Sequence, residues 1–305
     1  MTPRYGRYRL GVHNWTCFCS AGRAVQYRTW VTGRGGQVRR SGRLTPILSE
    51  RTASVLVLAI AVVMSLGPVP SSFAQGGPPM LTDDPGTPGS GAWEINFAYL
   101  EQHDRSERLR SFPHVDFNYG VGDHIQLKYE TGWLFTDAPE GGAVKNGLDD
   151  SLLGLKWRFL DQERGGLDMS VYPQLQVENP TGSVARGIAE PGPNLFLPLE
   201  FGHDFGQTKL IGELGYQYFH GQADEWVVGL LGARQVSEVL ELMAEVRSFS
   251  ENLLNHGDLV VNVGLRRALS ARVKLLASVG TGLTNGPDSP TFIAYLGVQL
   301  VLGEK

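Results

Sequence analysis

The run Ile125-Gln126-Leu127-Lys128-Tyr129-Glu130 alternates apolar and polar side chains at every step. Successive side chains of a β-strand point to opposite faces of the sheet, so this run has one apolar and one polar face. The same alternation recurs through most of the chain after Gly91, and no segment shows a sustained helical period. It predicts an all-β fold with strands in twelve segments: 91–101, 109–120, 124–135, 148–160, 167–178, 194–205, 208–219, 225–235, 239–249, 258–268, 271–283 and 291–302.

The two faces of these segments differ in charge. One face is apolar at positions such as Trp93, Phe97, Leu155 and Val263, and none of these positions is charged. The polar face carries acids and bases of both signs: Glu94, Asp116, Glu130, Glu178, Glu200, Glu213, Glu241, Glu245, Lys128, Lys156, Arg158, Arg247, Arg266 and Lys274. We expect the apolar face to contact lipid and the charged residues to line a lumen.

The connections between the segments alternate in length. Short ones lie near 122–123, 161–166, 206–207, 237–238 and 270, and longer ones span about 102–108, 136–147, 179–193, 220–224, 250–257 and 284–290. An even number of strands of about ten residues, with short turns alternating with longer loops, is typical of an antiparallel up-and-down transmembrane β-barrel. The alternative is a secreted soluble sandwich or lipocalin-like barrel with the apolar face inside, but such a fold has no reason to sort its connections by length.

Three prolines stand inside the predicted strands. Pro113, Pro173 and Pro198 each remove one N–H donor from a sheet ladder. We therefore expect β-bulges at these positions.

The N-terminal part differs from the rest. Residues 1–51 contain ten Arg, no Lys and one acid, whereas residues 52–305 contain 17 basic and 30 acidic residues. The stretch 54–66 has 13 residues without a charge, too few for a transmembrane helix of about 20 residues but suited to a signal peptide. We assign 51–74 as a signal peptide cleaved after Ala74, and 1–50 as a basic extension that reflects a mis-assigned start. A basic arm that binds nucleic acid or acidic lipid is the alternative, but it conflicts with secretion.

Residues 75–90 are rich in Gly and Pro and predict a linker or cap without regular structure. The barrel then occupies 91–302. An exported barrel of this kind belongs in the bacterial outer membrane, with lipid and the outer-membrane assembly machinery as partners.

Composition and motifs exclude several functions. Charged residues make up 19% of the chain and Gly is abundant, which argues against disordered, coiled-coil and nucleic-acid-binding proteins. No G-x-S-x-G motif places a nucleophile, and no spacing indicates a cofactor. Cys17 and Cys19 lack a second pair of ligands, and His103, His220 and His256 lie in three different longer loops without ligand spacing, so we predict no metal site. We also predict no cofactor and no enzymatic activity.

Several motifs resemble a known family. They are Pro78-Pro79-Met80-Leu81-Thr82-Asp83-Asp84-Pro85, the pair Trp93-Glu94, and the stretches 179–182, 194–199 and 212–216. Most of 77–302 is similar to bacterial outer-membrane proteins grouped as transporters of the phenol-degradation meta-pathway type, although Met80 stands where that family has an aromatic residue. The resemblance implies a barrel with a transport role, and its name implies an aromatic or apolar solute.

The predicted lumen leads to two functional hypotheses. Twelve strands lie between the eight that fill themselves with side chains and the sixteen that leave a wide pore. The charges therefore either line a narrow path for small solutes in a passive porin-like channel, or neutralise one another in a non-conducting structural or interaction barrel. A membrane hydrolase is a third, less favoured hypothesis.

Overall fold

The computed structural model describes residues 77–137, 143–253, 257–284 and 289–303. The predicted extension 1–50 and signal peptide 51–74 lie outside these residues. Within them, β-strands form nearly all of the regular structure, and the only helix is α2 (Gln162–Gly165). No helix in this part of the chain combines the length and the apolarity needed to span a membrane.

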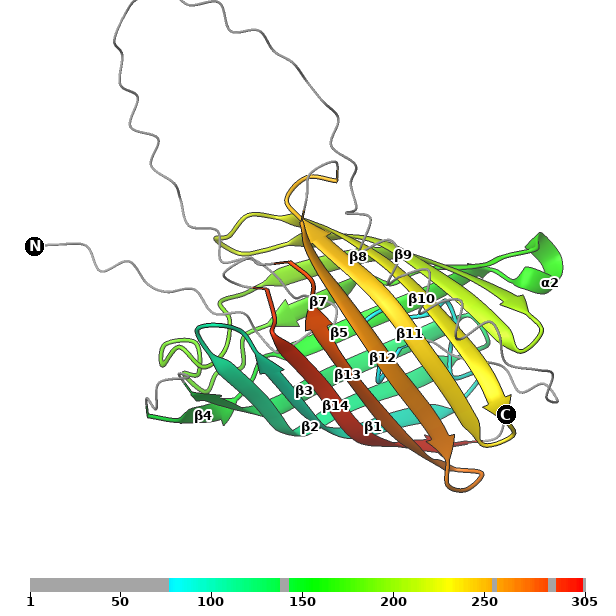
Figure 1. Cartoon of the computed structure of the whole chain (residues 1–305), viewed down its shortest axis with the longest axis horizontal. Helices are drawn as coiled ribbons and strands as arrows, with labels where there is room; N and C mark the ends of the chain where they lie inside the picture. The colour runs from blue at the N-terminus through cyan, green and yellow to red at the C-terminus, as the bar shows by residue number, and fades with distance from the viewer. Residues whose placement is uncertain (1–76, 138–142, 254–256, 285–288, 304–305) are drawn as a thin grey trace, which may run out of the picture.

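The strands follow one another around a wall, and each pairs antiparallel with its neighbours (Figure 1). Their bounds are β1 (Trp93–His103), β2 (Arg108–Val121), β3 (Ile125–Asp137), β4 (Lys145–Leu148), β5 (Ser151–Leu160), β6 (Asp168–Val171), β7 (Gln174–Val177), β8 (Asn194–Phe205), β9 (Thr208–Tyr218), β10 (Glu225–Ser237), β11 (Leu240–Ser250), β12 (Asp258–Ala268), β13 (Val273–Gly282) and β14 (Phe292–Leu302).

The first and last strands close the wall. Their register runs from Trp93 opposite Leu302 to His103 opposite Phe292. Because β1 also pairs with β2 and β14 with β13, neither strand has a free edge. The closed antiparallel barrel of twelve wall strands that the alternation predicts is confirmed.

Two of the twelve wall strands are each built from two pieces. Strand β4 pairs with one end of β3, with Leu148 opposite Trp133, and β5 pairs with the other end, with Leu155 opposite Leu127. In the same way, β6 and β7 follow one another between β5 and β8. Both pairs of pieces therefore count once each in the wall.

The predicted bulge at Pro113 is present. The ladder between β2 and β3 shifts between Ser111 and His114, so Phe112 and Pro113 have no partner on β3. The missing N–H of a proline makes such an unpaired position a suitable place for it.

The predicted bulges at Pro173 and Pro198 are wrong. The pairing of β6 and β7 with β8 keeps one register across both prolines. Each proline retains its carbonyl as an acceptor, for Leu155 N–H and Tyr172 N–H respectively. Proline φ values lie within the β region, so one lost donor does not shift a register fixed by pairs on both sides.

The two ends of the barrel differ. The short-turn end carries tight connections such as the one after β8, where Gly206 has a φ of 69° that favours glycine. The long-loop end carries the connections 138–144 and 178–193. The β1–β2 connection at this end spans only 104–107 and is shorter than predicted.

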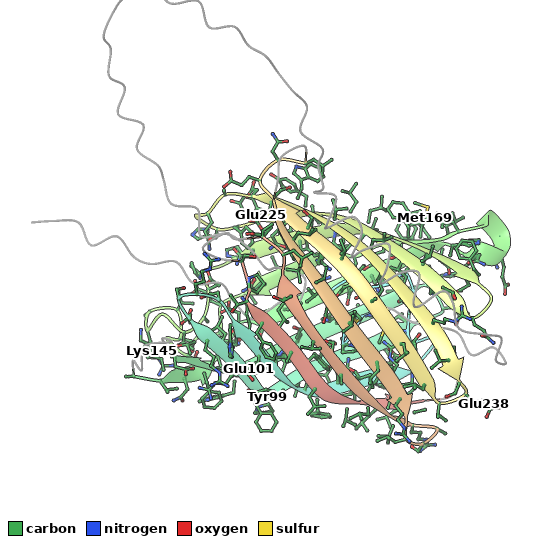
Figure 2. The ribbon with its side chains drawn as sticks, viewed as in Figure 1. Tyr99, Glu101, Lys145, Met169, Glu225 and Glu238 are labelled. Atoms are coloured by element: carbon green, nitrogen blue, oxygen red, sulfur yellow. The ribbon has the colours of Figure 1, made fainter. Side chains whose placement is uncertain are left out.

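Side chains alternate between the two surfaces of the wall. Leu155 is 47% exposed and the neighbouring Lys156 is 1% exposed, and the same contrast separates Val263 from Asn262. Figure 2 shows Tyr99 pointing away from the barrel. The apolar residues predicted for the outer face lie outside, and none of them is buried.

The closing register predicts where a disulfide can form. With Cys17 and Cys19 replaced by Ser, we expect Ile95→Cys and Leu300→Cys to cross-link, because directly opposite residues have Cα atoms about 4.5–5.5 Å apart, within disulfide range. The measurement is electrophoretic mobility of the denatured protein with and without reductant. Ile95→Cys with Leu296→Cys is the control, because Leu296 is opposite Tyr99 and hence about 13 Å out of register. Cross-linking of the control pair alone would contradict this closure.

Candidate functional site

The structure places most of the predicted lumen residues inside the barrel. Nine are buried: Asp116, Glu130, Lys156, Glu200, Glu213, Glu241, Glu245, Arg247 and Arg266. Glu94 and Lys128 line a cavity, and Arg158 and Lys274 are partly exposed near the short-turn end. Glu178 differs, because it is exposed beyond β7 and accepts a hydrogen bond from Gly192 N–H.

The inner charges of β2 and β3 form one cluster. Lys128 Nζ lies 3.2 Å from Asp116 Oδ1 and 2.7 Å from Glu130 Oε2. Glu130 also lies 3.3 Å from His114 Nε2, and Asn118 Nδ2 donates to Asp116 at 3.0 Å. Each charge in this cluster therefore has a partner, as burial of charge requires.

A second cluster surrounds Lys156 on β5. Its Nζ lies 3.2 Å from Glu200 on β8 and 4.5 Å from the centre of the Tyr172 ring. Ser170 donates to the same Glu200 carboxylate. The ammonium group is thus held by a carboxylate and an aromatic face.

Two arginines form ion pairs on the wall of β9, β11 and β12. Arg247 pairs with Glu213 at 2.5 Å, and Arg266 pairs with Glu241 at 2.6 Å. Arg247 is fully buried, so its guanidinium depends on protein groups for all of its hydrogen bonds.

Most of residues 77–90, here called the N-terminal segment, lies inside the barrel. In Figure 1 the cyan chain that precedes β1 runs behind β11 and β12. Met80, Leu81 and Thr82 are at most 2% exposed. The segment lacks regular structure, as predicted, but it fills part of the lumen and does not act as a linker outside it.

Lumen side chains hold the backbone of this segment. The Glu245 carboxylate accepts the N–H groups of Leu81 and Thr82, both at 2.7 Å. Arg247 donates to the carbonyl of Leu81, and Arg266 donates to that of Pro78 at 2.9 Å. Backbone groups that cannot reach water are thereby paired with ionised side chains, which form the stronger class of hydrogen bonds.

The cluster around Lys156 holds the segment as well. Lys156 Nζ donates to the carbonyl of Asp84 and lies 3.3 Å from the Asp83 carboxylate. Ser278 Oγ donates to the carbonyl of Pro79 at 2.7 Å. Ionised and polar groups from opposite sides of the barrel therefore fix a segment that has no secondary structure of its own.

Inward glycines make room for the segment. A Cβ added to Gly229 would lie 2.6 Å from Thr82 Oγ1, and one added to Gly264 would lie 2.6 Å from Met80 Sδ. Both distances are too short for contacting atoms, so the wall approaches the segment closely because these positions lack side chains.

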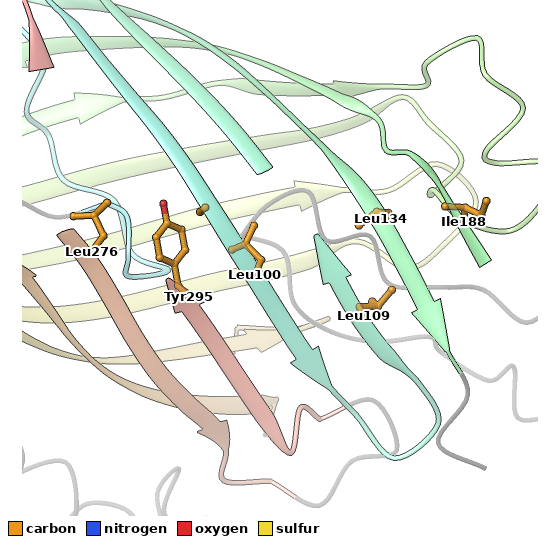
Figure 3. Close-up of a cluster of buried hydrophobic side chains, with 7 residues drawn as sticks. Leu100, Leu109, Leu134, Ile188, Leu276 and Tyr295 are labelled. Carbon is orange, nitrogen blue, oxygen red and sulfur yellow. The ribbon is translucent and has the colours of Figure 1, made fainter. Parts of the chain in front are cut away.

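The interior is less polar than the sequence predicts. Buried apolar side chains form three clusters on the inner face, among them one of Ala98, Leu100, Leu109, Leu134, Ile188, Leu276 and Tyr295. Figure 3 shows this cluster along β13, β14, β1, β2 and β3, with Ile188 supplied by the 178–193 connection. The predicted apolar outer face is therefore observed. The inner face, predicted to be polar, carries both apolar and charged side chains.

Two small cavities lie between the N-terminal segment and the wall. One has a volume of about 40 Å³ and is lined by Glu94, Asn96, Asp116 and Gln299 among others. The other has a volume of about 30 Å³ and lies beside His114. Each has space for a few water molecules and not for an organic solute.

Ser111, His114 and Glu130 lie together but do not form an accessible catalytic site. Ser111 Oγ lies 3.4 Å from His114 Nδ1, and His114 Nε2 lies 3.3 Å from Glu130. The Ser111 hydroxyl is fully buried, and the cavity beside His114 is too small for a substrate. A nucleophile has to reach its substrate, so this arrangement gives no support to hydrolysis. The described residues also hold no group of three or more His, Cys, Asp or Glu side chains placed to bind a metal ion.

Sequence reasoning missed the position of the N-terminal segment and its partner acids, Asp83 and Asp84. One signal was available. Met80 and Leu81 are apolar residues in a stretch that is otherwise suited to solvent. Apolar side chains favour burial, so their presence indicates that this stretch packs against the protein.

Comparisons with known proteins agree with the fold. No family model and no curated protein matches the chain, so the resemblance to phenol-pathway transporters stays a prediction. Among solved structures, an outer membrane channel from Pseudomonas putida F1 is similar, with 15% identity over 75% of this chain and 100% of that chain and a TM-score of 0.54. KdgM porin (10% identity, 68% of this chain and 99% of that chain, TM-score 0.46) and NanC porin (6%, 68% and 98%, 0.45) are more distant.

The contacts of Glu245 lead to a prediction about the N-terminal segment. Glu245→Gln removes the charge that accepts two N–H groups, each bond being worth about 1.5–3 kcal/mol, so we expect the amides of Leu81 and Thr82 to exchange with solvent at least about tenfold faster. Hydrogen exchange of the purified protein measures this. Glu101 lies on the outer face of β1, where it pairs with His103 and Arg108. Glu101→Gln is therefore the matched control and should leave both amides unchanged. Equal protection in Glu245→Gln would show that other contacts suffice.

Proposed function

We propose that this protein is an outer-membrane channel that lets small solutes pass through a narrow, charged lumen. The observation that carries the proposal is a closed wall with an apolar outside and ion pairs inside. The N-terminal segment narrows the lumen in the conformation described above. Passage of a solute larger than water requires this segment to move.

The outer surface supports a location in lipid. Large apolar side chains such as Trp157, Leu197 and Leu296 are 52, 47 and 56% exposed, and they continue around the wall. Contact of such a surface with water is unfavourable by roughly 25 cal/mol for every Å². A hydrocarbon layer removes that penalty, and the closed wall needs no hydrogen-bond partner from it.

A second candidate, a non-conducting barrel, is favoured by a separate observation. The charged side chains of the lumen pair with one another and with the segment, and two cavities between the segment and the wall have volumes of only about 40 and 30 Å³. Charges paired in this way can stabilise the barrel without any solute passing through it. Conductance distinguishes the two candidates.

The solute class that we propose is small with an apolar or aromatic part. Leu100, Leu109 and Leu134 belong to a buried apolar cluster on the inner side of the wall toward the long-loop end, which a passing solute would contact when the lumen opens. Solute uptake into liposomes compares phenylalanine with serine, two solutes of equal net charge. We expect phenylalanine to enter faster than its larger size would allow in a purely polar pore, and slower entry in proportion to size would contradict the assignment.

Removal of the segment should increase conductance. We expect a variant lacking residues 77–86 to show a larger unitary conductance in planar bilayers than the full protein, because the segment fills the lumen. Heat-modifiable electrophoretic mobility checks that the variant is folded, and Glu245→Gln offers a second, full-length variant with a loosened segment. Glu101→Gln should conduct like the parent. Absence of conductance in all folded variants would overturn the channel and favour the non-conducting barrel.

The lipid-facing assignment leads to a stability prediction. Leu155→Arg should lower the free energy of unfolding from lipid vesicles by about 2–4 kcal/mol, the usual range for a cation near the bilayer midplane. Leu155→Phe keeps the position apolar and should change the stability far less. Denaturant titration of vesicle-bound protein provides both values, and equal stability of the two variants would place Leu155 in water.

A further inference from the structure

Three acceptor oxygens line the larger cavity without a hydrogen-bond partner among the described residues. They are Glu94 Oε1, Asn96 Oδ1 and Gln299 Oε1, and each atom is buried. A buried acceptor without a donor is unfavourable by about 1–3 kcal/mol, so these oxygens favour a partner that enters the cavity. Water in the cavity can donate to these oxygens, and a partly hydrated cation can contact them directly.

The strand register brings these oxygens together. Glu94 and Asn96 are two residues apart on β1, so both side chains are on its inner face. Gln299 on β14 is directly opposite Asn96. Asn96 Nδ2 donates to Asp116 Oδ2 at 3.0 Å, which fixes the amide orientation and identifies Oδ1 as the remaining acceptor. Asp116 also lines the cavity, so a second carboxylate lies beside the three oxygens.

The basic groups that line the same cavity already have carboxylate partners. Lys128 lies 2.7 Å from Glu130, and Arg266 lies 2.6 Å from Glu241. Lys156 contacts Glu200 at 3.2 Å and also holds the N-terminal segment. The cavity therefore offers oxygens with unused lone pairs, while its cations are engaged, and this balance favours a cation over an anion.

We infer that Glu94, Asn96 and Gln299 form a cation-binding subsite in the lumen. One carboxylate and two amide oxygens suit a partly hydrated monovalent ion such as Na⁺ or K⁺, whereas Ca²⁺ takes six to eight oxygens and usually several carboxylates. The subsite itself does not depend on transport. Its consequence, a lumen that prefers cations, rests on the proposed channel function.

Ion selectivity tests this consequence. In a KCl gradient across a planar bilayer, the reversal potential of the parent protein should indicate preference for K⁺ over Cl⁻. Glu94→Gln keeps the size of the side chain and removes its charge, so the K⁺ to Cl⁻ permeability ratio should fall several-fold. Glu101→Gln, the same change on the outer face of β1, should leave the ratio unchanged. A preference for Cl⁻, or an unchanged ratio in Glu94→Gln, would overturn the role of the subsite in ion selectivity.

A binding measurement separates the subsite from the channel function. The thermal unfolding midpoint of the parent should be higher in KCl than in N-methyl-D-glucamine chloride of equal ionic strength, because an ion that binds only the folded state stabilises it. The difference should disappear in Glu94→Gln and remain in Glu101→Gln. A K⁺-dependent midpoint without conductance would overturn the channel and leave the subsite standing. Conductance with no K⁺ dependence of the midpoint would overturn the subsite alone.

Discussion

Backbone hydrogen bonding around a closed ring is the constraint on which the rest of this structure depends. The pairing of β1 with β14 removes the two free edges that an open sheet would have. Once the ring is closed, the strand period of two assigns every residue to the outside or the inside, and a slip of one residue would exchange the two sets. The apolar exterior and the charged lumen are therefore both consequences of one register.

Closure of the wall also separates the charged side chains of the interior from bulk water. Charges such as Arg247 and Lys156 have no access to bulk water, so they persist only with partners. The wall supplies carboxylates, and the N-terminal segment supplies backbone carbonyls and N–H groups. The segment and the ion pairs are mutually dependent, because each satisfies groups that the other leaves without solvent.

The local pattern of the sequence predicts the strands of the wall. It does not predict which residues fill the interior of the barrel. The predicted strand 109–120 matches Arg108–Val121, because alternation is a property of neighbouring residues. The expected bulge at Pro198 fails because register is decided by pairs on two neighbouring strands. The position of Leu81 is decided by Glu245, 164 residues away, and no local pattern reports a contact of that separation. The same holds for the opposition of Asn96 and Gln299, which only the closing pair creates.

The inward glycines Gly229 and Gly264 make the inner surface of the wall complementary in shape to the N-terminal segment. The sequence of the segment and the residues of the wall that contact it therefore cannot change independently. Glycine leaves no side-chain volume to remove at these positions, so a bulkier N-terminal segment in a related barrel would require the wall itself to change, and a wall that gained side chains there would clash with the original segment. Chimeras between such barrels should therefore be functional only when the segment and strands β10 and β12 are transferred as a unit.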